Sequence, residues 1–447
     1  MSDTVKKGPF SRVTKKAMAR FHSAKPRSEF AKNVVTLMTG TSVAQILPFL
    51  ITPILSRLYT EPQFALYSLF TRILSPLGVV VTGRYELAIM LPEEEEDAVN
   101  IFALSILCST VLALFLLAVV AVFSHPLANL IGTPEIRPWL YLLPFALIAN
   151  SMYQSFNYWF NRKQAYARLS KNRVVRSGLT SVSKVALGFQ KLSPGGLIVG
   201  DVLGQALATS FFVRSSLRED RALLGLVKWP SIVRVAKRYA KFPLVAVPSD
   251  LINALTQVLP TLFLLDGFGK VVLGDFAFSQ LVLGAPLVII AGAFADVFKQ
   301  RASVEWQETG QCRSLWISTA KKLLFISLPM FAVLYFAAPI VVPIIFGERW
   351  AESARFVQIL VPYYFLAFLA SPLSRTLIVA EKQHVDLVWQ VSLFIVSFLT
   401  LQAGVQTKSP EWTIGYYGAG YAALYLVYLA LSYRASLGDK PRVEAGS

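Results

Sequence analysis

The sequence predicts an all-α membrane protein with about 12 transmembrane helices. Hydrophobic residues make up 55% of its 447 residues and charged residues only 15%, which is too apolar for a soluble protein of this length. Apolar runs of about 20 residues recur along the chain, and a helix of that length crosses a hydrocarbon core about 30 Å thick. Charged residues inside several runs predict a polar interior between the helices.

The runs give the predicted domain organisation. A basic arm (1–32) precedes six spans (33–213), a linker (214–241), six further spans (242–433) and a tail (434–447). The spans themselves cover residues 33–56, 64–91, 98–123, 138–159, 174–189, 195–213, 242–265, 271–298, 323–346, 356–380, 385–405 and 413–433.

A weak internal repeat relates the two halves. The sequence QILP at 45–48 recurs as QVLP at 257–260, and Phe-Ala at 64–65 recurs at 276–277, each 212 residues later. Because each half has an even number of spans, both halves enter the membrane from the same side. The sequence therefore predicts a parallel repeat, in which two lobes rock around a site near the middle of the membrane.

The distribution of positive charge predicts the orientation. With the N-terminus inside, 32 of the 43 Lys and Arg residues fall on the cytoplasmic side and seven outside. Both termini are then cytoplasmic. The net charge of +17 reflects this asymmetry, so no nucleic-acid partner is predicted.

Three polar segments flank the spans. Within the linker, KWPSIVRVAKRYAKF (228–242) has the pattern of an amphipathic helix lying at the membrane surface and tying the lobes together. The basic arm either rests on anionic headgroups or serves as a disordered topology signal. The acidic turn PEEEED (92–97) is interpreted as solvated.

Charged residues inside the spans are the first candidates for a binding site. The four cations are Arg72, Arg84, Lys184 and Arg375. Guanidinium and ammonium groups in a partly desolvated cleft suit phosphate. Glu86 and Asp250 are candidates for coupling transport to an ion. Arg84 and Glu86 are two positions apart, so on a helix they would face different directions and pair poorly with each other.

Amide side chains at helical spacing are the second set of candidates. They are Gln45 in the first span, Asn150, Gln154 and Asn157 in the fourth, and Asn253 and Gln257 in the seventh. Such stripes can bind sugar hydroxyl groups. Two alternatives stay open, because the amides can bridge helices without any ligand and the cations can form structural ion pairs with the carboxylates.

Three segments carry a resemblance to a known family. FAKNVVTLMTGTSVAQ (30–45), TGRYELAIMLP (82–92) and IFGERWAESARFVQILVPYYFLAFLASPLS (345–374) resemble the Wzx-type O-antigen and polysaccharide flippases of bacteria. Their superfamily also holds the multidrug and toxic compound extruders and the peptidoglycan lipid flippase. The resemblance spans residues 30 to about 433. Arg84 and Glu86 match the family pattern directly, whereas the acidic turn departs from it.

The resemblance implies twelve spans in two six-helix lobes around a central, often cationic cavity. It implies movement of a polyprenyl diphosphate-linked oligosaccharide, such as an O-antigen, capsule or exopolysaccharide repeat unit, across the bacterial inner membrane. The implied partners are this lipid-linked cargo, the bilayer, a coupling proton or sodium ion, and other polysaccharide-assembly membrane proteins.

Two further functions are weighed against this one. An ion-coupled antiporter exporting organic cations is kept open by the intramembrane carboxylates. A membrane polymerase or ligase would need a sizeable extracytoplasmic loop with acid, base or nucleophile candidates, and the longest one (124–137) is short and mostly apolar. We therefore expect a transporter that is not an enzyme and that needs no cofactor. Cys108 and Cys312 have no metal-ligand spacing, so no metal site is predicted.

Overall fold

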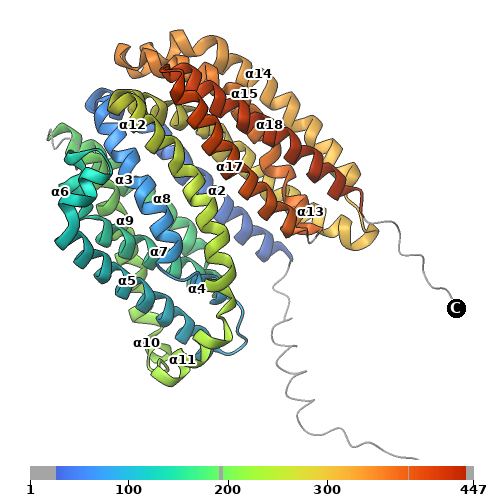
Figure 1. The fold of residues 1–447 in the computed structure, drawn as a ribbon. Coiled ribbons are helices and arrows are strands. Elements are labelled where there is room, and N and C mark those ends of the chain that lie inside the picture. Colours follow the sequence, from blue (N-terminus) through green and yellow to red (C-terminus); the bar gives the residue numbers. More distant parts are fainter. Residues whose placement is uncertain (1–26, 191–194, 381, 439–447) are drawn as a thin grey trace, which may run out of the picture.

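The protein is described by a computed structural model over residues 27–190, 195–380 and 382–438, and every regular element in these ranges is a helix (Figure 1). Most of the predicted basic arm and of the predicted tail lies outside the described residues. The first half of the chain contains α2 (Arg27–Leu58), α3 (Glu61–Val80), α4 (Tyr85–Ala88), α5 (Glu95–Leu130), η1 (Pro134–Ile136), α6 (Arg137–Leu140), α7 (Leu143–Arg162), α8 (Tyr166–Phe189) and α9 (Gly195–Glu219).

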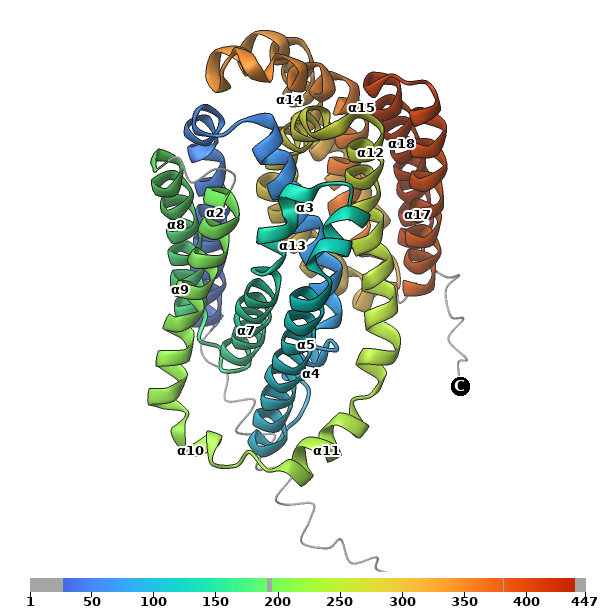
Figure 2. The ribbon, with the colours of Figure 1, turned by 60° about the vertical axis from the view of Figure 1, so that its left-hand side comes forward.

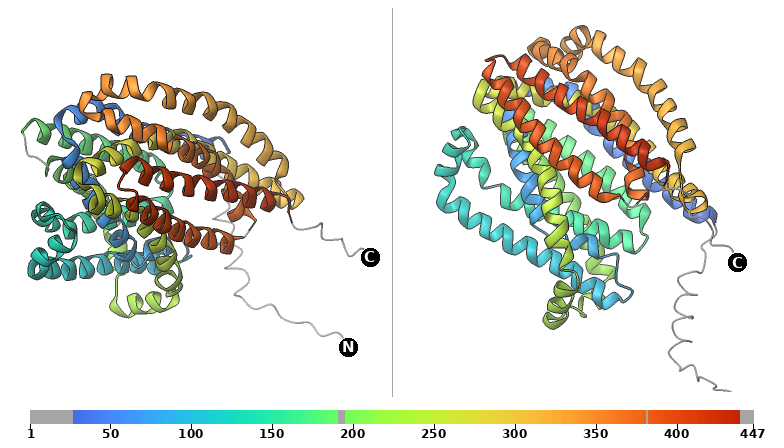
Figure 3. Two further views of the ribbon diagram at one scale, coloured as in Figure 1. Left: turned by 45° about the horizontal axis from the view of Figure 1, so that its top comes forward. Right: turned by 45° about the vertical axis from the view of Figure 1, so that its right-hand side comes forward.

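Two short helices connect this half to the next. The remaining elements are α10 (Arg221–Leu224), α11 (Trp229–Arg238), η2 (Phe242–Ala246), α12 (Val247–Pro286), η3 (Leu287–Ala291), α13 (Gly292–Thr309), α14 (Arg313–Phe346), η4 (Glu348–Trp350), α15 (Ala351–Leu373), α16 (Arg375–Val379), α17 (Gln383–Gln406) and α18 (Pro410–Ser436). α5 lies on the opposite side of the molecule from α14, α17 and α18 (Figure 3).

Nine stretches of the described chain are long and apolar enough to cross a membrane, which makes this a multi-pass membrane protein. The predicted fourth and fifth spans form α7 and α8, which are not among the nine because both are rich in polar side chains. The predicted seventh and eighth spans lie in one stretch, Phe242–Thr309. A kink at Gly269, where φ is +81°, divides that stretch.

Aromatic residues of α3, α12 and η4 join the two halves. The junction of α14 and α15, which contains η4, lies at the end of the molecule opposite α10 and α11 (Figure 2). Phe64 of α3 packs edge-on against Trp350 and Phe278, with ring centroids 5.1 and 5.8 Å away. Trp350 stacks on Phe278 at 4.1 Å and donates a hydrogen bond of 3.0 Å to the carbonyl of Ser56. Tyr59 packs edge-on against Phe64, with ring centroids 6.5 Å apart, and we call Tyr59, Phe64, Phe278 and Trp350 the aromatic interlock. Each ring pair adds about 0.5–1.5 kcal/mol beyond its buried area.

The end of the acidic turn docks on the linker, whereas Glu93, Glu94 and Glu95 are exposed, as the prediction of a solvated turn requires. The side chain of Asp97 is only 8% exposed and pairs with Arg234 at 2.7 Å and Arg238 at 3.1 Å, both on α11. Glu96 accepts a hydrogen bond of 3.1 Å from Ser231. The arginines of α11 have the spacing of neighbours on one helix face, so one buried carboxylate can hold both. The linker is thereby fixed to the start of α5.

Candidate functional site

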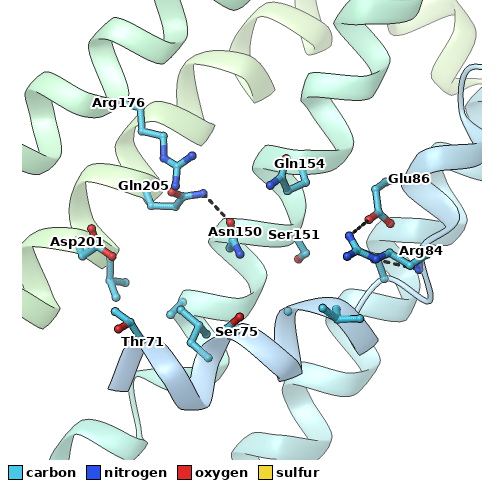
Figure 4. A pocket seen from close by; sticks show the side chains of 16 residues that line it. Thr71, Ser75, Arg84, Glu86, Asn150, Ser151, Gln154, Arg176, Asp201 and Gln205 are labelled. Carbon is cyan, nitrogen blue, oxygen red and sulfur yellow. Dashed lines mark hydrogen bonds and ion pairs between the residues drawn. The ribbon is translucent and has the colours of Figure 1, made fainter. Parts of the chain in front are cut away.

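Two adjoining cavities lie between the helices of the first half. One, of about 360 Å³, is enclosed by α3, α4, α7, α8 and α9, and the other, of about 590 Å³, by α2, α3, α7, α8 and α9 with one residue of α12. Both are lined by Gln154, Arg176 and Asp201, so they form one polar region, part of which Figure 4 shows. We call this region the N-half cavity.

Close helix packing builds one wall of the cavity. A Cβ atom on Gly204 of α9 would lie 2.4 Å from the Cα of Thr180 on α8, and one on Gly200 would lie 2.8 Å from the backbone nitrogen of Lys184. Only glycine permits this approach of two backbones. The contact turns one polar face of α8 and the neighbouring Asp201 toward the cavity.

That face of α8 carries three cations, and only Lys184 was among the predicted site residues. Arg173, Arg176 and Lys184 all line the cavity, together with Ser177 and Thr180. Their spacing of three, four, seven and eleven residues from Arg173 follows one side of a helix. This spacing is a signal in the sequence that could have identified Arg173 and Arg176, although Arg173 lies just before the predicted fifth span.

Arg173 and Arg176 have no carboxylate within ion-pair distance in the described part of the chain. Arg173 Nη1 donates to the hydroxyl of Thr41 at 2.6 Å. The guanidinium carbon of Arg176 lies 4.4 Å from the ring centroid of Tyr153. Both side chains are only partly buried and can reach an anion inside the cavity.

Lys184 is held by two partners at the other end of the same face. Its Nζ lies 3.0 Å from Asp201 Oδ1 and donates to the hydroxyl of Tyr67 at 2.8 Å. The side chain of Lys184 is 12% exposed. This predicted site residue therefore lines the cavity as one member of an ion pair.

Arg84 also lines the cavity, in a turn rather than a helix. Its φ is +60° and that of Gly83 is +57°, so the helical path breaks between α3 and α4. Arg84 Nη1 then reaches Glu86 Oε1 at 3.4 Å, and Arg84 Nε lies 2.8 Å from Asp250 Oδ2 of α12. The expectation that Arg84 and Glu86 pair poorly is wrong, because it assumed a continuous helix.

Four of the six predicted amide side chains line the N-half cavity, and two do not. Gln45, Asn150, Gln154 and Asn157 line the cavity, and the amide of Asn150 accepts from Gln205 at 3.4 Å. Gln205, like the hydroxyl groups of Thr71 and Ser75, was not predicted. Asn253 is exposed on α12.

Arg72 and Arg375 do not line the N-half cavity. Arg72 donates to Gln280 Oε1 at 2.9 Å and to Gln257 Oε1 at 3.5 Å, which ties α3 to α12. Arg375 is exposed at the start of α16. The structure thus brings the other first-half candidates together at the cavity, where Asp250 pairs with Arg84. It leaves four candidates outside the cavity: Arg72, Asn253, Gln257 and Arg375.

Two carboxyl groups outside the apolar stretches have shifted pKa values. Burial opposes ionisation of Asp220, but hydrogen bonds from Lys163, Trp159 and Ser216 outweigh it and hold the pKa of Asp220 below its ordinary value. The Lys270 ammonium, hydrogen-bonded to Glu135, lowers the pKa of that carboxyl. Asp220 joins the ends of α7 and α9, and the Lys270–Glu135 pair joins the two halves.

Residues 54–355 match the family described as polysaccharide biosynthesis protein. The chain belongs to this family. It is 21% identical over 237 residues to the teichuronic acid biosynthesis protein TuaB of Bacillus subtilis (strain 168). The match covers 51% of this chain and about half, 49%, of TuaB.

Among solved structures, the fold is similar to that of two transporter types. The lipid II flippase MurJ in an inward closed conformation matches with a TM-score of 0.70 and 11% identity, over 90% of this chain and 87% of MurJ. An inward-facing multidrug resistance MATE family transporter matches with a TM-score of 0.66 and 14% identity, over 88% of this chain and 95% of that one. At these identities the likeness concerns the fold.

Proposed function

We propose that the protein moves a polyprenyl diphosphate-linked oligosaccharide from the cytoplasmic to the periplasmic leaflet of the bacterial inner membrane. The observation that carries the proposal is the pair Arg173 and Arg176, two partly buried guanidinium groups in a polar cavity with no carboxylate partner in the described chain. A diphosphate can bind both guanidinium groups bidentately. Membership of a polysaccharide biosynthesis family and a fold shared with a lipid II flippase support this choice of cargo.

The sugars of the cargo would lie along the amides beside these arginines. Asn150, Gln154 and Asn157 occupy successive turns of α7, and Gln45 faces them from α2. Amides both donate and accept hydrogen bonds, as sugar hydroxyl groups do. The prenyl tail would stay in the lipid. The glycan could be an O-antigen, capsule or exopolysaccharide repeat unit, which the family leaves open.

The architecture proposed for this task has twelve spans in two six-helix lobes with both termini cytoplasmic. Nine apolar stretches of the described chain give ten of these spans, because the kink at Gly269 divides Phe242–Thr309 into two. α7 and α8 would be the other two. Contact between the lobes at the aromatic interlock would close the periplasmic end, and alternating access would require that contact to open. Movement of the lobes then exposes the cavity to each side in turn.

Export of organic cations is the second candidate, favoured by the MATE-like fold. The cavity lining argues against it, because four cations, Arg84, Arg173, Arg176 and Lys184, outnumber two carboxylates, Glu86 and Asp201. An excess of positive charge in a partly desolvated site attracts anions and repels cations. Drug-sensitivity assays on a deletion strain would detect this activity.

Coupling to a proton or sodium ion remains part of the proposal. Glu86 and Asp250 both hold Arg84 in this structure. An ion that neutralises Asp250 would loosen the contact between the turn before α4 and α12, and one that neutralises Glu86 would release Arg84 from its local partner. Partner proteins of polysaccharide assembly would receive the cargo on the periplasmic side.

The test is flipping of a fluorescent polyprenyl diphosphate-linked sugar by the protein in liposomes. Arg173→Gln with Arg176→Gln should reduce flipping strongly, because each lost charge-assisted contact lowers affinity about tenfold to a hundredfold. Lys171→Gln is the matched control, since Lys171 is exposed on α8 and does not line the cavity. Normal flipping by a well-inserted double variant would contradict the proposal.

A further inference from the structure

A second cavity, distinct from the polar one, opens on the outer side of α7 and α9. It has a volume of about 670 Å³ and is almost entirely apolar, with Phe145, Met152 and Val213 among its lining residues. The small residues Ala149 and Ala206 leave the space between the larger side chains. We call it the α7–α9 groove.

The groove has the length and polarity of a lipid chain. Its lining on α9 runs from Val202 to Arg218, which is about 24 Å at 1.5 Å per residue. One leaflet of a bilayer contributes about half of a hydrocarbon core about 30 Å thick. The groove can therefore hold an acyl chain from the headgroup level to the middle of the membrane.

Two arginines mark one end of the groove. Arg214 and Arg218 are one helical turn apart near the end of α9, on the side of the molecule where α10 and α11 lie (Figure 2). Both are exposed, and neither has a carboxylate within ion-pair distance in the described ranges. The nearby acids are already engaged, because Glu219 pairs with Arg168 and Asp220 with Lys163.

We propose that the α7–α9 groove binds an anionic glycerophospholipid, with its phosphate on Arg214 and Arg218 and an acyl chain along the groove. Basic residues at the end of a groove between membrane helices are a recurring site for anionic headgroups. The two guanidinium groups supply the charge complementarity that distinguishes this groove from an ordinary lipid-facing surface.

The tail of the transported cargo fits the groove less well. Hydrogen bonds close the seam between α7 and α9: Thr209 donates to the carbonyl of Ala149 at 3.2 Å, and Gln205 donates to Asn150 at 3.4 Å. A lipid with its head in the N-half cavity and its tail in the groove would have to break this seam. The site therefore belongs to a membrane lipid and does not depend on the identity of the cargo.

The experiment titrates the purified full-length protein in detergent with phosphatidylglycerol or with phosphatidylethanolamine of the same acyl chains. Native mass spectrometry counts the bound lipids. Phosphatidylglycerol should bind about thirtyfold more tightly, as two arginines near one anionic headgroup predict. Arg214→Gln with Arg218→Gln should remove this preference. The matched control, Arg221→Gln with Lys228→Gln, removes the same charge from exposed linker positions and should keep it.

A second variant tests the groove without altering charge. Ala206→Phe should fill the groove and weaken phosphatidylglycerol binding, whereas Ala121→Phe, on the exposed side of α5, should not. Equal binding of the two lipids to the unaltered protein would overturn the proposal, as would a preference that survives both groove variants. A polyprenyl phosphate that outcompetes phosphatidylglycerol in the groove would assign it to the cargo tail instead.

Discussion

Arg84 is held between carboxylates from two parts of the chain, and this arrangement determines its charge environment. Glu86 is nearly buried, with 3% of its side chain exposed, and Asp250 approaches from α12. Together the three groups carry a formal net negative charge. A diphosphate would meet repulsion here unless one carboxylate were neutralised. Arg173 and Arg176, which lack such partners in the described residues, are the better phosphate ligands.

This environment predicts a structural effect of removing Arg84. Arg84→Gln should lower thermal stability in detergent, because it leaves the buried carboxylate of Glu86 unpaired, a change that costs about 3 kcal/mol or more. Adding Glu86→Gln to Arg84→Gln should restore most of the loss, since it removes the unpaired charge. If Arg84→Gln keeps full stability but loses flipping, Arg84 contacts the cargo directly.

The pairing of Arg84 with Glu86 could not be predicted from their spacing. On a continuous helix, two residues that are two positions apart point in different directions. Gly83 and Arg84 instead both adopt positive φ, and the resulting turn brings the Arg84 side chain to Glu86. The Thr-Gly pair before Arg84 is a turn signal within an otherwise apolar run. Partners on distant helices, such as Asp250, depend on tertiary packing that local sequence does not encode.

Among the helices, α8 contributes the largest number of charged residues to the N-half cavity. Its polar face supplies three cations to the cavity, although its composition made it the least apolar of the predicted spans. Hydropathy predicts lipid-facing helices well, but a helix that lines a polar cavity on one side does not need a fully apolar surface. Apolar runs therefore predict most of the helices. Arg173 and Arg176, which line the cavity, could be predicted only from their helical spacing within the polar sequence of α8.

The contact between α8 and α9 gives a prediction for this element pair. Gly204→Val should disrupt the N-half cavity and lower both thermal stability and flipping, because its side chain would overlap the backbone of Thr180. Gly178→Ala is the matched control on α8, since no heavy atom lies within 4 Å of the added Cβ. Thermal unfolding of both variants, compared with the unaltered protein, checks the prediction. Equal stability of all three would mean that the helices can separate without cost.

For the whole molecule, the two halves contribute unequally to the cavity. Nearly all lining residues come from the first half, with Leu281 the single contribution of α12 to the larger cavity. The second half instead meets the first through the aromatic interlock, the Arg84–Asp250 pair and the Lys270–Glu135 pair. The internal repeat predicts two related lobes, but none of the predicted amides and cations of the second half, Asn253, Gln257 and Arg375, lines the N-half cavity.

Alternating access predicts that locking the halves together at the aromatic interlock end should stop transport. Glu135→Cys with Lys270→Cys places two thiols where an ion pair now joins the halves, in a background with Cys108 and Cys312 replaced by Ala. Cys312 itself should react poorly with the cross-linker. Burial, with a smaller contribution from the negative charge of Glu305, raises the pKa of Cys312 to about 11, so it stays a thiol at neutral pH. A short thiol cross-linker should then abolish flipping.

Two controls separate this effect from damage by the reagent. Each single-cysteine variant should keep flipping after the same treatment, and a cleavable cross-linker should restore activity in the double variant after reduction. The expected loss follows because a cavity closed at one end cannot release cargo there, whatever its affinity. Full flipping by quantitatively cross-linked protein would mean that the halves need not separate at this end, and the cargo would then have to leave the N-half cavity sideways into the lipid.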